Sequence, residues 1–164
     1  MSIAVYPGSF DPVTLGHLNI IKRAASIFEE LYVCVMSDFE KHPLFTHDER
    51  VEFIKRTVGK YKNVKVETSK DLLVDYMKAK GAKVIIKGMR AVSDFDREFQ
   101  LALINKKLDP NVETLFMPSS EKYTYLSSTV VKEMAKYGAD LSTFVPKEII
   151  DDLVIKVKTV GWRK

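Results

Sequence analysis

The sequence predicts an α/β fold, namely a doubly wound five-stranded parallel sheet with helices on both faces. Short apolar runs rich in β-branched residues alternate with longer segments of helical periodicity along the chain. The runs are almost continuously apolar, which is typical of strands that are covered on both faces. A chain of 164 residues suits one core, so we expect a single domain over residues 1–164.

Each expected element follows from a local signal. Strands are expected at residues 3–6, 31–36, 64–67, 83–87 and 112–117. The first strand is expected to stop at Pro7-Gly8, a pair that turns the backbone. Helices are expected just after residues 14–16 and at residues 47–58, 71–80, 94–108, 127–137 and 147–157. Thr46 and Glu49 form a capping box at the second helix, and Ser93 is expected to cap the fourth. Gly81 is expected to end the third helix, and Ser127 or Ser128 can serve as the N-cap of the fifth.

Composition argues against several classes of protein. Cys34 is the single cysteine, which excludes an internal disulfide and a multi-cysteine zinc site. The longest uninterrupted apolar run, residues 31–36, is too short to cross a bilayer, and we expect no secretory leader. We therefore expect a cytoplasmic protein with no membrane partner. The net charge of +4 comes from scattered lysines, which favours a small anionic substrate over nucleic acid.

Polar residues follow each expected strand. Ligands of parallel sheets bind outside the carboxyl ends of the strands, so this clustering predicts a binding site along one edge of the sheet. In strand order the residues are Ser9, Phe10 and His17; Ser37, Asp38 and Lys41; residues 71–73; Lys87, Gly88, Met89 and Arg90; and Ser119, Ser120 and residues 123–129.

The segment after the first strand has the layout of a phosphate site. A loop with Gly8 leads into a helix N-terminus, which presents unpaired N–H groups and a partial positive charge. His17 lies in the first turn of this helix, and its imidazole is expected to point at an anion that the loop holds. From the pattern alone, a structural role for His17 is as well supported as a functional one.

Three stretches resemble a known family. Gly8-Ser9-Phe10-Asp11-Pro12, followed by Thr14-x-Gly16-His17, resembles the signature of the nucleotidylyltransferase superfamily. Residues 86–95 and 123–133 narrow the resemblance to the phosphopantetheine adenylyltransferase family. The resemblance implies a Rossmann-like nucleotidylyltransferase fold. It also implies transfer of the adenylyl group of ATP to 4′-phosphopantetheine, which forms dephospho-coenzyme A and pyrophosphate in the penultimate step of coenzyme A biosynthesis.

The resemblance also implies roles for individual residues. His17, Lys41 and Arg90 would be catalytic in a direct in-line attack on the α-phosphate of ATP. The implied ATP-binding residues are Ser9, Phe10, His17, Gly88, Met89, Arg90, Glu98, Tyr123, Thr124, Tyr125, Leu126, Ser127, Ser128 and Thr129. The residues implied for the acceptor are Ser9, Lys41, Leu73 and Lys87. The family usually carries arginine where this chain has Lys87.

The chemistry of these residue types is compatible with such roles. A phosphate attacker is already an anion and needs no general base. The difficulty is to bring two anions together, which the cations Lys41, Lys87 and Arg90 address. The three hydroxyls of residues 127–129 exceed what one helix cap requires, and the extra donors suit phosphate oxygens. The sequence contains neither a P-loop pattern nor G-x-G-x-x-G.

The resemblance further implies Mg²⁺ bound with ATP and no metal site made by the protein itself, feedback inhibition by coenzyme A, and a homohexamer. The helix at residues 94–108 is apolar on more than one face, which fits either deep burial or an oligomer contact. Three alternatives stay open. They are a related nucleotidylyltransferase that uses nicotinate mononucleotide or glycerol 3-phosphate, a nucleotide-binding regulator without turnover, and a small basic RNA-binding module.

Overall fold

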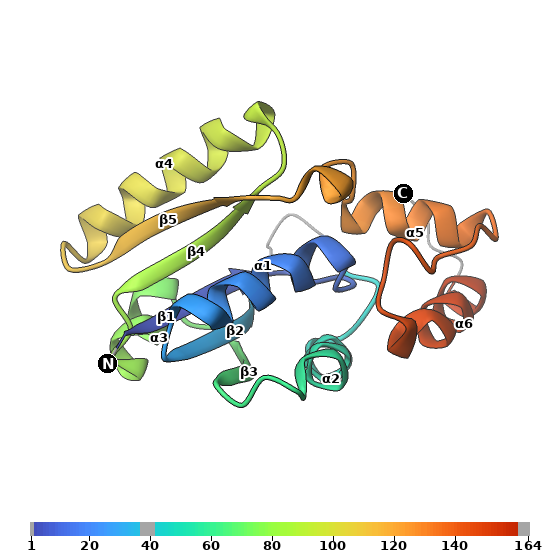
Figure 1. Ribbon diagram of the computed structural model, residues 1–164, viewed down its shortest axis with the longest axis horizontal. Coiled ribbons are helices and arrows are strands. Elements are labelled where there is room, and N and C mark those ends of the chain that lie inside the picture. Colours follow the sequence, from blue (N-terminus) through green and yellow to red (C-terminus); the bar gives the residue numbers. More distant parts are fainter. Residues whose placement is uncertain (1, 37–41, 161–164) are drawn as a thin grey trace.

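The computed structural model describes residues 2–36 and 42–160, so Ser37, Asp38 and Lys41 of the predicted site lie outside the described residues. Five parallel strands form one sheet in the order β3-β2-β1-β4-β5 (Figure 1). The strands are β1 (Ile3–Gly8), β2 (Glu30–Met36), β3 (Val64–Ser69), β4 (Val84–Met89) and β5 (Glu113–Pro118). The predicted fold class is therefore confirmed.

Helices connect the strands and cover both faces of the sheet. They are α1 (Leu15–Ile27), α2 (His47–Val58), α3 (Leu73–Lys80), α4 (Val92–Leu108), α5 (Ser128–Lys136) and α6 (Ile150–Val160), with short 3₁₀ turns η1 (Glu121–Tyr123) and η2 (Lys147–Ile149). Crossovers between parallel strands are right-handed, so α1 and α2 lie on one face and α3 and α4 on the other. The direction of winding reverses between β1 and β4, which is where sheets of this kind bind ligands.

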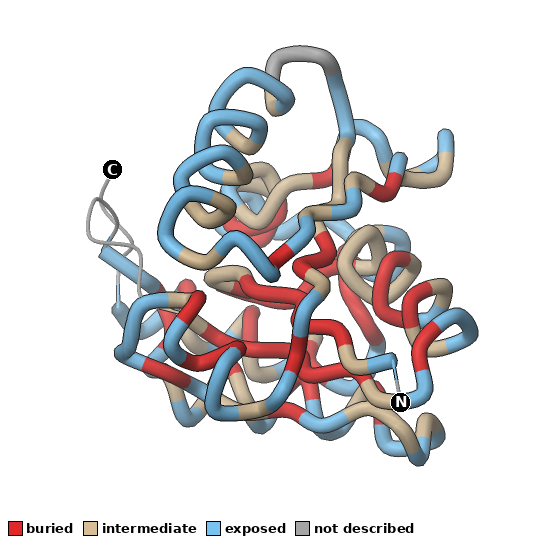
Figure 2. Tube along the Cα trace, turned by 90° about the vertical axis from the view of Figure 1, so that its left-hand side faces the viewer, coloured by how far each residue is buried: buried red, intermediate tan, exposed pale blue. Residues whose placement is uncertain are grey.

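Each face of the sheet buries its own core. Figure 2 shows the buried residues gathered in the interior of the molecule. Successive residues of a strand point to opposite faces. Thus Val33 of β2 joins the larger core with α1, α2, α5 and α6. Tyr32 and Cys34 point to the other face and pack with Tyr76 and Met77 of α3. The strands and helices that alternate along the sequence thus pack into two cores, one on each face of the sheet.

Two local boundary signals are wrong, and other element ends differ from the expected ones by one to three residues. β1 continues through Pro7 and Gly8, because β1 pairs with β2 as far as Gly8, whereas its pairing with β4 covers only Ala4 and Val5. The missing N–H of Pro7 therefore interrupts no rung of the β1–β4 ladder. The fourth helix is not capped by Ser93. It begins at Val92, with Ala91 at the N-cap position and no side-chain cap.

Other helix signals are confirmed. Thr46 and Glu49 form the expected capping box at the start of α2. The Ser127 hydroxyl accepts a hydrogen bond from the Val130 N–H and caps α5. Gly81, with a φ of 66°, ends α3 in the left-handed conformation that glycine adopts without strain. The last helix is preceded by the 3₁₀ turn η2 and extends to Val160 rather than Val157.

The helix α4 stands apart from both cores. It lies over β4 and β5 at one end of the molecule (Figure 1), and no residue of α4 from 94 to 108 is buried. Of the two explanations for its apolar faces, deep burial within one chain is thus wrong. Exposed apolar side chains of α4 are Phe95, Phe99, Leu101, Leu103, Ile104 and Leu108. No helix within the described residues is long and apolar enough to span a bilayer.

Candidate active site

The loop between β1 and α1 positions His17 through a capping box. Thr14 is the N-cap residue of α1, and its hydroxyl oxygen accepts a hydrogen bond from the His17 N–H at 3.3 Å. In return, the Thr14 N–H donates to Nδ1 of His17 at 3.0 Å. Both ends of the first turn are thus used to orient one imidazole ring. The ring also meets Phe10 edge-on, with 5.1 Å between ring centres.

This environment makes His17 a neutral hydrogen-bond donor. Burial, and next the positive charge of Arg90, lower the pKa of His17 to about 4. Because Nδ1 accepts a backbone N–H, the single proton of the neutral ring resides on Nε2. An Nε2–H group at the positive end of a helix can donate to a phosphate oxygen without first losing a proton.

Phe10 and Ser9 belong to the loop after β1 and are held there by different contacts. Phe10 has a φ of 47°, and its ring is buried against Tyr6 with 5.3 Å between ring centres. Its predicted ligand contact must therefore be made by the backbone rather than by the ring. The carbonyl oxygen of Ser9 accepts a hydrogen bond from Nη1 of Arg50 at 2.7 Å. This bond fixes the first residue of the loop, and the predicted role of the Ser9 hydroxyl stays a prediction.

Residues at the end of β4 are paired with the helix that follows. Nζ of Lys87 lies 3.0 Å from Oε2 of Glu98, which is on α4. The two were predicted to contact different substrates, and here they partly neutralise each other. Both side chains are partly buried, and a partly buried charge is stabilised by a partner of opposite charge.

Arg90 joins three parts of the candidate site. Its Nε and Nη2 donate to the two carboxylate oxygens of Asp94 at 3.0 and 3.1 Å, and Nη1 donates to the carbonyl of Leu126 at 2.9 Å. A guanidinium has five N–H donors. Three of them are engaged in these bonds, so two remain for a phosphate. Arg90 is thus held in place before any ligand arrives.

The segment 123–129 packs against the start of α1. A Cβ added to Gly16 would lie 3.6 Å from Cβ of Tyr123, which is ordinary van der Waals contact and shows how near the two segments are. The Ser128 hydroxyl donates to the carbonyl of Pro12 at 2.8 Å. Leu126 is buried, and its carbonyl accepts the hydrogen bond from Arg90. Tyr125 and Thr129 are exposed.

The structure brings most of the predicted residues to one edge of the sheet. Those after β1 and β4 and those in the segment 123–129 are linked by the bonds described above. Leu73 begins α3 just after β3 and packs at the margin of the smaller core. Because β3 is the edge strand, Leu73 lies farther along the same carboxyl edge of the sheet. Lys41 lies outside the described residues.

Three buried charged residues support the site and were missed by sequence analysis. Asp11, Arg50 and Lys132 are all less than a tenth exposed. In a sequence, such residues resemble the solvated charges of a protein surface. The available signal was the position of Asp11 in the glycine-containing loop, where a charge between apolar residues needs partners.

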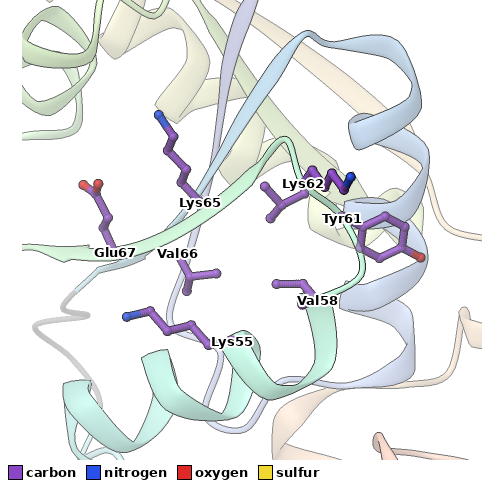
Figure 3. Close-up of a pocket in the computed structure, with 9 residues that line it drawn as sticks. Lys55, Val58, Tyr61, Lys62, Lys65, Val66 and Glu67 are labelled. Carbon is purple, nitrogen blue, oxygen red and sulfur yellow. The ribbon is translucent and has the colours of Figure 1, made fainter.

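A hollow of about 470 Å³ lies elsewhere, between α2 and the edge strand β3 (Figure 3). In it, Val58 and Val66 face each other, while Lys65 and Glu67 leave β3 on the other side. None of its lining residues belongs to the loops after β1, β4 or β5. It is therefore distinct from the candidate active site.

Comparison with known proteins identifies the sequence relatives of the chain. Residues 5–134 match the family model described as "Cytidylyltransferase-like". The chain is 55% identical over 157 residues to a phosphopantetheine adenylyltransferase of Clostridium botulinum strain Hall, covering 96% of each chain. It is 52% identical over 158 residues to that of C. botulinum strain Eklund 17B, covering 96% of this chain and 99% of the relative.

The fold itself is shared with more distant proteins. The structure of Plasmodium falciparum nicotinic acid mononucleotide adenylyltransferase, complexed with NaAD, superposes with a TM-score of 0.70 at 14% identity. That comparison covers 99% of this chain and 98% of the other, and it shows that the chain has a Rossmann-like nucleotidyltransferase fold. With the sequence matches above, the chain belongs to the phosphopantetheine adenylyltransferase family, within the cytidylyltransferase-like proteins.

Proposed function

We propose that this protein transfers the adenylyl group of ATP to 4′-phosphopantetheine, with dephospho-coenzyme A and pyrophosphate as products. The observation that carries this proposal is the neutral His17, whose Nε2–H is oriented by the capping box at the N-terminus of α1. The names of the relatives support the choice of acceptor.

The proposed reaction is a single in-line displacement. A terminal phosphate oxygen of the acceptor forms a bond to the α-phosphorus of ATP while the bond to the pyrophosphate oxygen breaks. The attacking phosphate is an anion, so no base has to remove a proton. His17 donates from Nε2 to an α-phosphate oxygen, and the two free donors of Arg90 neutralise charge that moves toward pyrophosphate. Lys41 and Lys87 attract the acceptor phosphate.

The other predicted residues fit around this centre. We assign the hydroxyl-rich segment 127–129 to the β- and γ-phosphates, because it begins a helix beside the loop that carries His17. Glu98 lies toward the adenosine, and Lys87 exchanges its contact with Glu98 for the acceptor phosphate when that substrate binds. Ser9, Leu73 and the remaining residues of the sequence prediction line the two substrates.

We propose that Mg²⁺ enters the site with ATP. Within the described residues, no group of three or more His, Cys, Asp or Glu side chains could hold a metal ion. The carboxylates of Asp94 and Glu98 are paired with Arg90 and Lys87, so phosphate oxygens and water suit the metal as ligands. The metal would supply neutralisation of the phosphate charges.

The experiment that tests the function measures pyrophosphate release from ATP and Mg²⁺ with and without 4′-phosphopantetheine. We expect release only with the acceptor, together with dephospho-coenzyme A. If pyrophosphate is released only with nicotinate mononucleotide or glycerol 3-phosphate, using ATP or CTP, 4′-phosphopantetheine is not the acceptor. The protein would then be a related nucleotidylyltransferase. ATP binding without release from any acceptor would contradict catalysis and favour a regulator.

We further propose that the protein is a homohexamer that acts in the cytoplasm. The exposed apolar faces of α4 support self-association, since exposed patches of this kind mark interaction sites. Coenzyme A differs from the proposed product by one phosphate group. We therefore propose that it binds in place of the product and inhibits the enzyme.

A further inference from the structure

The carboxylate of Asp11 is a buried junction between three segments of the chain. Oδ1 accepts a hydrogen bond from the Phe45 N–H at 2.9 Å, and Oδ2 accepts one from the Leu44 N–H, also at 2.9 Å. Oδ2 also lies 2.8 Å from Nζ of Lys132. Asp11 is 5% exposed and Lys132 8% exposed, so these bonds form in a largely dry environment.

The three segments are those that surround the candidate site. Asp11 belongs to the loop between β1 and the helix of His17, and Lys132 lies on α5, one helical turn after Ser128. Leu44 and Phe45 precede α2. The Ser128–Pro12 hydrogen bond joins the same loop to the same helix α5, and Arg50 of α2 holds Ser9 at the start of this loop.

A gain in stability is a weak explanation for burying the Asp11–Lys132 ion pair. Two charges lose their hydration on burial, and replacing a buried ion pair by apolar residues is often neutral or stabilising. Geometry is a stronger reason, because the pair connects the loop before α1 to α5 one helical turn after Ser128. The N-termini of these two helices present donors to the phosphates in the proposed reaction.

We propose that Asp11 and Lys132 are a positioning pair that sets the placement of the α5 N-terminus relative to the α1 N-terminus. The proposal rests on the proposed function for its catalytic consequence. Neither side chain contacts a substrate. They act through His17 and the segment 127–129, whose donors must converge on one triphosphate.

The kinetic test uses Asp11→Asn, Lys132→Met and the double variant. An asparagine at 11 keeps one acceptor but turns an NH₂ group toward the second backbone N–H, and Lys132→Met leaves the carboxylate without its cation. We expect each single variant to lower kcat by about 10- to 100-fold, the usual effect of misplaced catalytic groups. We expect the double variant to melt at a higher temperature than Lys132→Met, because it no longer buries the Asp11 carboxylate without its lysine partner. Its kcat stays low.

The comparison with stability separates positioning from folding. If kcat in the double variant recovers together with the melting temperature, the pair is only structural and the proposal is wrong. Unchanged kcat in both single variants would overturn it as well. Val157→Ala, a truncation of a buried residue of α6, serves as the control that lowers the melting temperature without touching the loop, and its kcat should be normal.

Amide hydrogen exchange provides a readout that does not depend on the reaction. In Lys132→Met, and in Asp11→Asn should Lys132→Met fail to fold, exchange at the capped N–H groups of His17 and Val130 should rise about tenfold as both helix N-termini loosen. The N–H groups of Val5 and Val33 in the sheet should stay unchanged. Unaltered exchange at His17 and Val130 would refute the positioning role even if the wild-type protein proves inactive with 4′-phosphopantetheine. A failure of the proposed function would instead be seen as an absence of dephospho-coenzyme A formation by the wild-type protein.

Discussion

At the scale of the residue, the two nitrogens of His17 have separate tasks. Nδ1 belongs to the fold, since it accepts the Thr14 N–H, and Nε2 belongs to the proposed chemistry. We predict that His17→Asn retains the cap, because its side-chain oxygen can take the place of Nδ1, but lowers kcat about 10²- to 10⁴-fold through loss of the donor. His17→Ala should lose the cap as well and cost about 1 kcal/mol of stability. Steady-state kinetics and thermal melting distinguish the two variants, and near-normal kcat in folded His17→Asn would remove His17 from the mechanism.

The pKa of the same residue predicts how stability changes with pH. The pKa of His17 is lowered in the folded protein to about 4, against an ordinary value of 6.5. Between these values the unfolded chain binds more protons than the folded one, so the free energy of unfolding falls as the pH is lowered from 6.5 to 4. The contribution of His17 is at most about 3 kcal/mol, since one pKa unit corresponds to about 1.4 kcal/mol. Urea unfolding at several pH values should show a smaller loss in His17→Asn than in wild type. Equal losses in both proteins would show that His17 does not titrate in this way.

At the scale of the element, the start of α2 illustrates a signal that is complete within four residues. The Thr46 hydroxyl accepts the Glu49 N–H at 3.2 Å, and Oε2 of Glu49 accepts the Thr46 N–H at 2.7 Å. We predict that Thr46→Ala costs about 1 kcal/mol and lowers the melting temperature by about 2–4 °C. The matched control is Thr57→Ala in the last turn of α2, where the hydroxyl only donates to the Ile54 carbonyl. This change should be neutral or slightly stabilising, because alanine is the better helix former. Calorimetry compares both, and equal shifts would contradict a specific role for the cap.

At the scale of the whole molecule, α4 is the helix whose apolar side chains stay exposed in a single chain. Leu103, on α4, is 57% exposed and lies among other exposed apolar side chains of the helix. We predict that Leu103→Glu dissociates the proposed hexamer into smaller species, because a charge would be buried without a partner at the contact. Ile155→Glu on α6 is the matched control, since Ile155 is 64% exposed outside this patch. Light scattering after size-exclusion chromatography measures the mass. A wild-type monomer, or an equal effect of both substitutions, would contradict association through α4.

Local patterns in the sequence were sufficient for the alternation of strands and helices, and for the caps at Thr46 and Ser127. They also placed His17 in the first turn of a helix after a glycine-containing loop. These features could be predicted because they depend on residues within about four positions of one another. The order of the strands was not predicted, because the connection from β3 to β4 crosses β2 and β1. The error at Pro7 arose because pairing with the neighbouring strand β2, rather than the local residue, decides where β1 ends. At Ser93 the helix begins at Val92 without a side-chain cap.

The tertiary structure alone decided which charges meet. Asp11 and Lys132 are 121 positions apart, and Arg90 reaches the Leu126 carbonyl across 36. It also decided that the Phe10 ring is buried, that Lys87 is paired with Glu98, and that α4 is exposed rather than covered. The physical reason is that the free energy of a charge or an apolar side chain depends on what surrounds it in space. Periodicity reports the local backbone conformation, whereas the surroundings of a side chain exist only once distant segments have packed together.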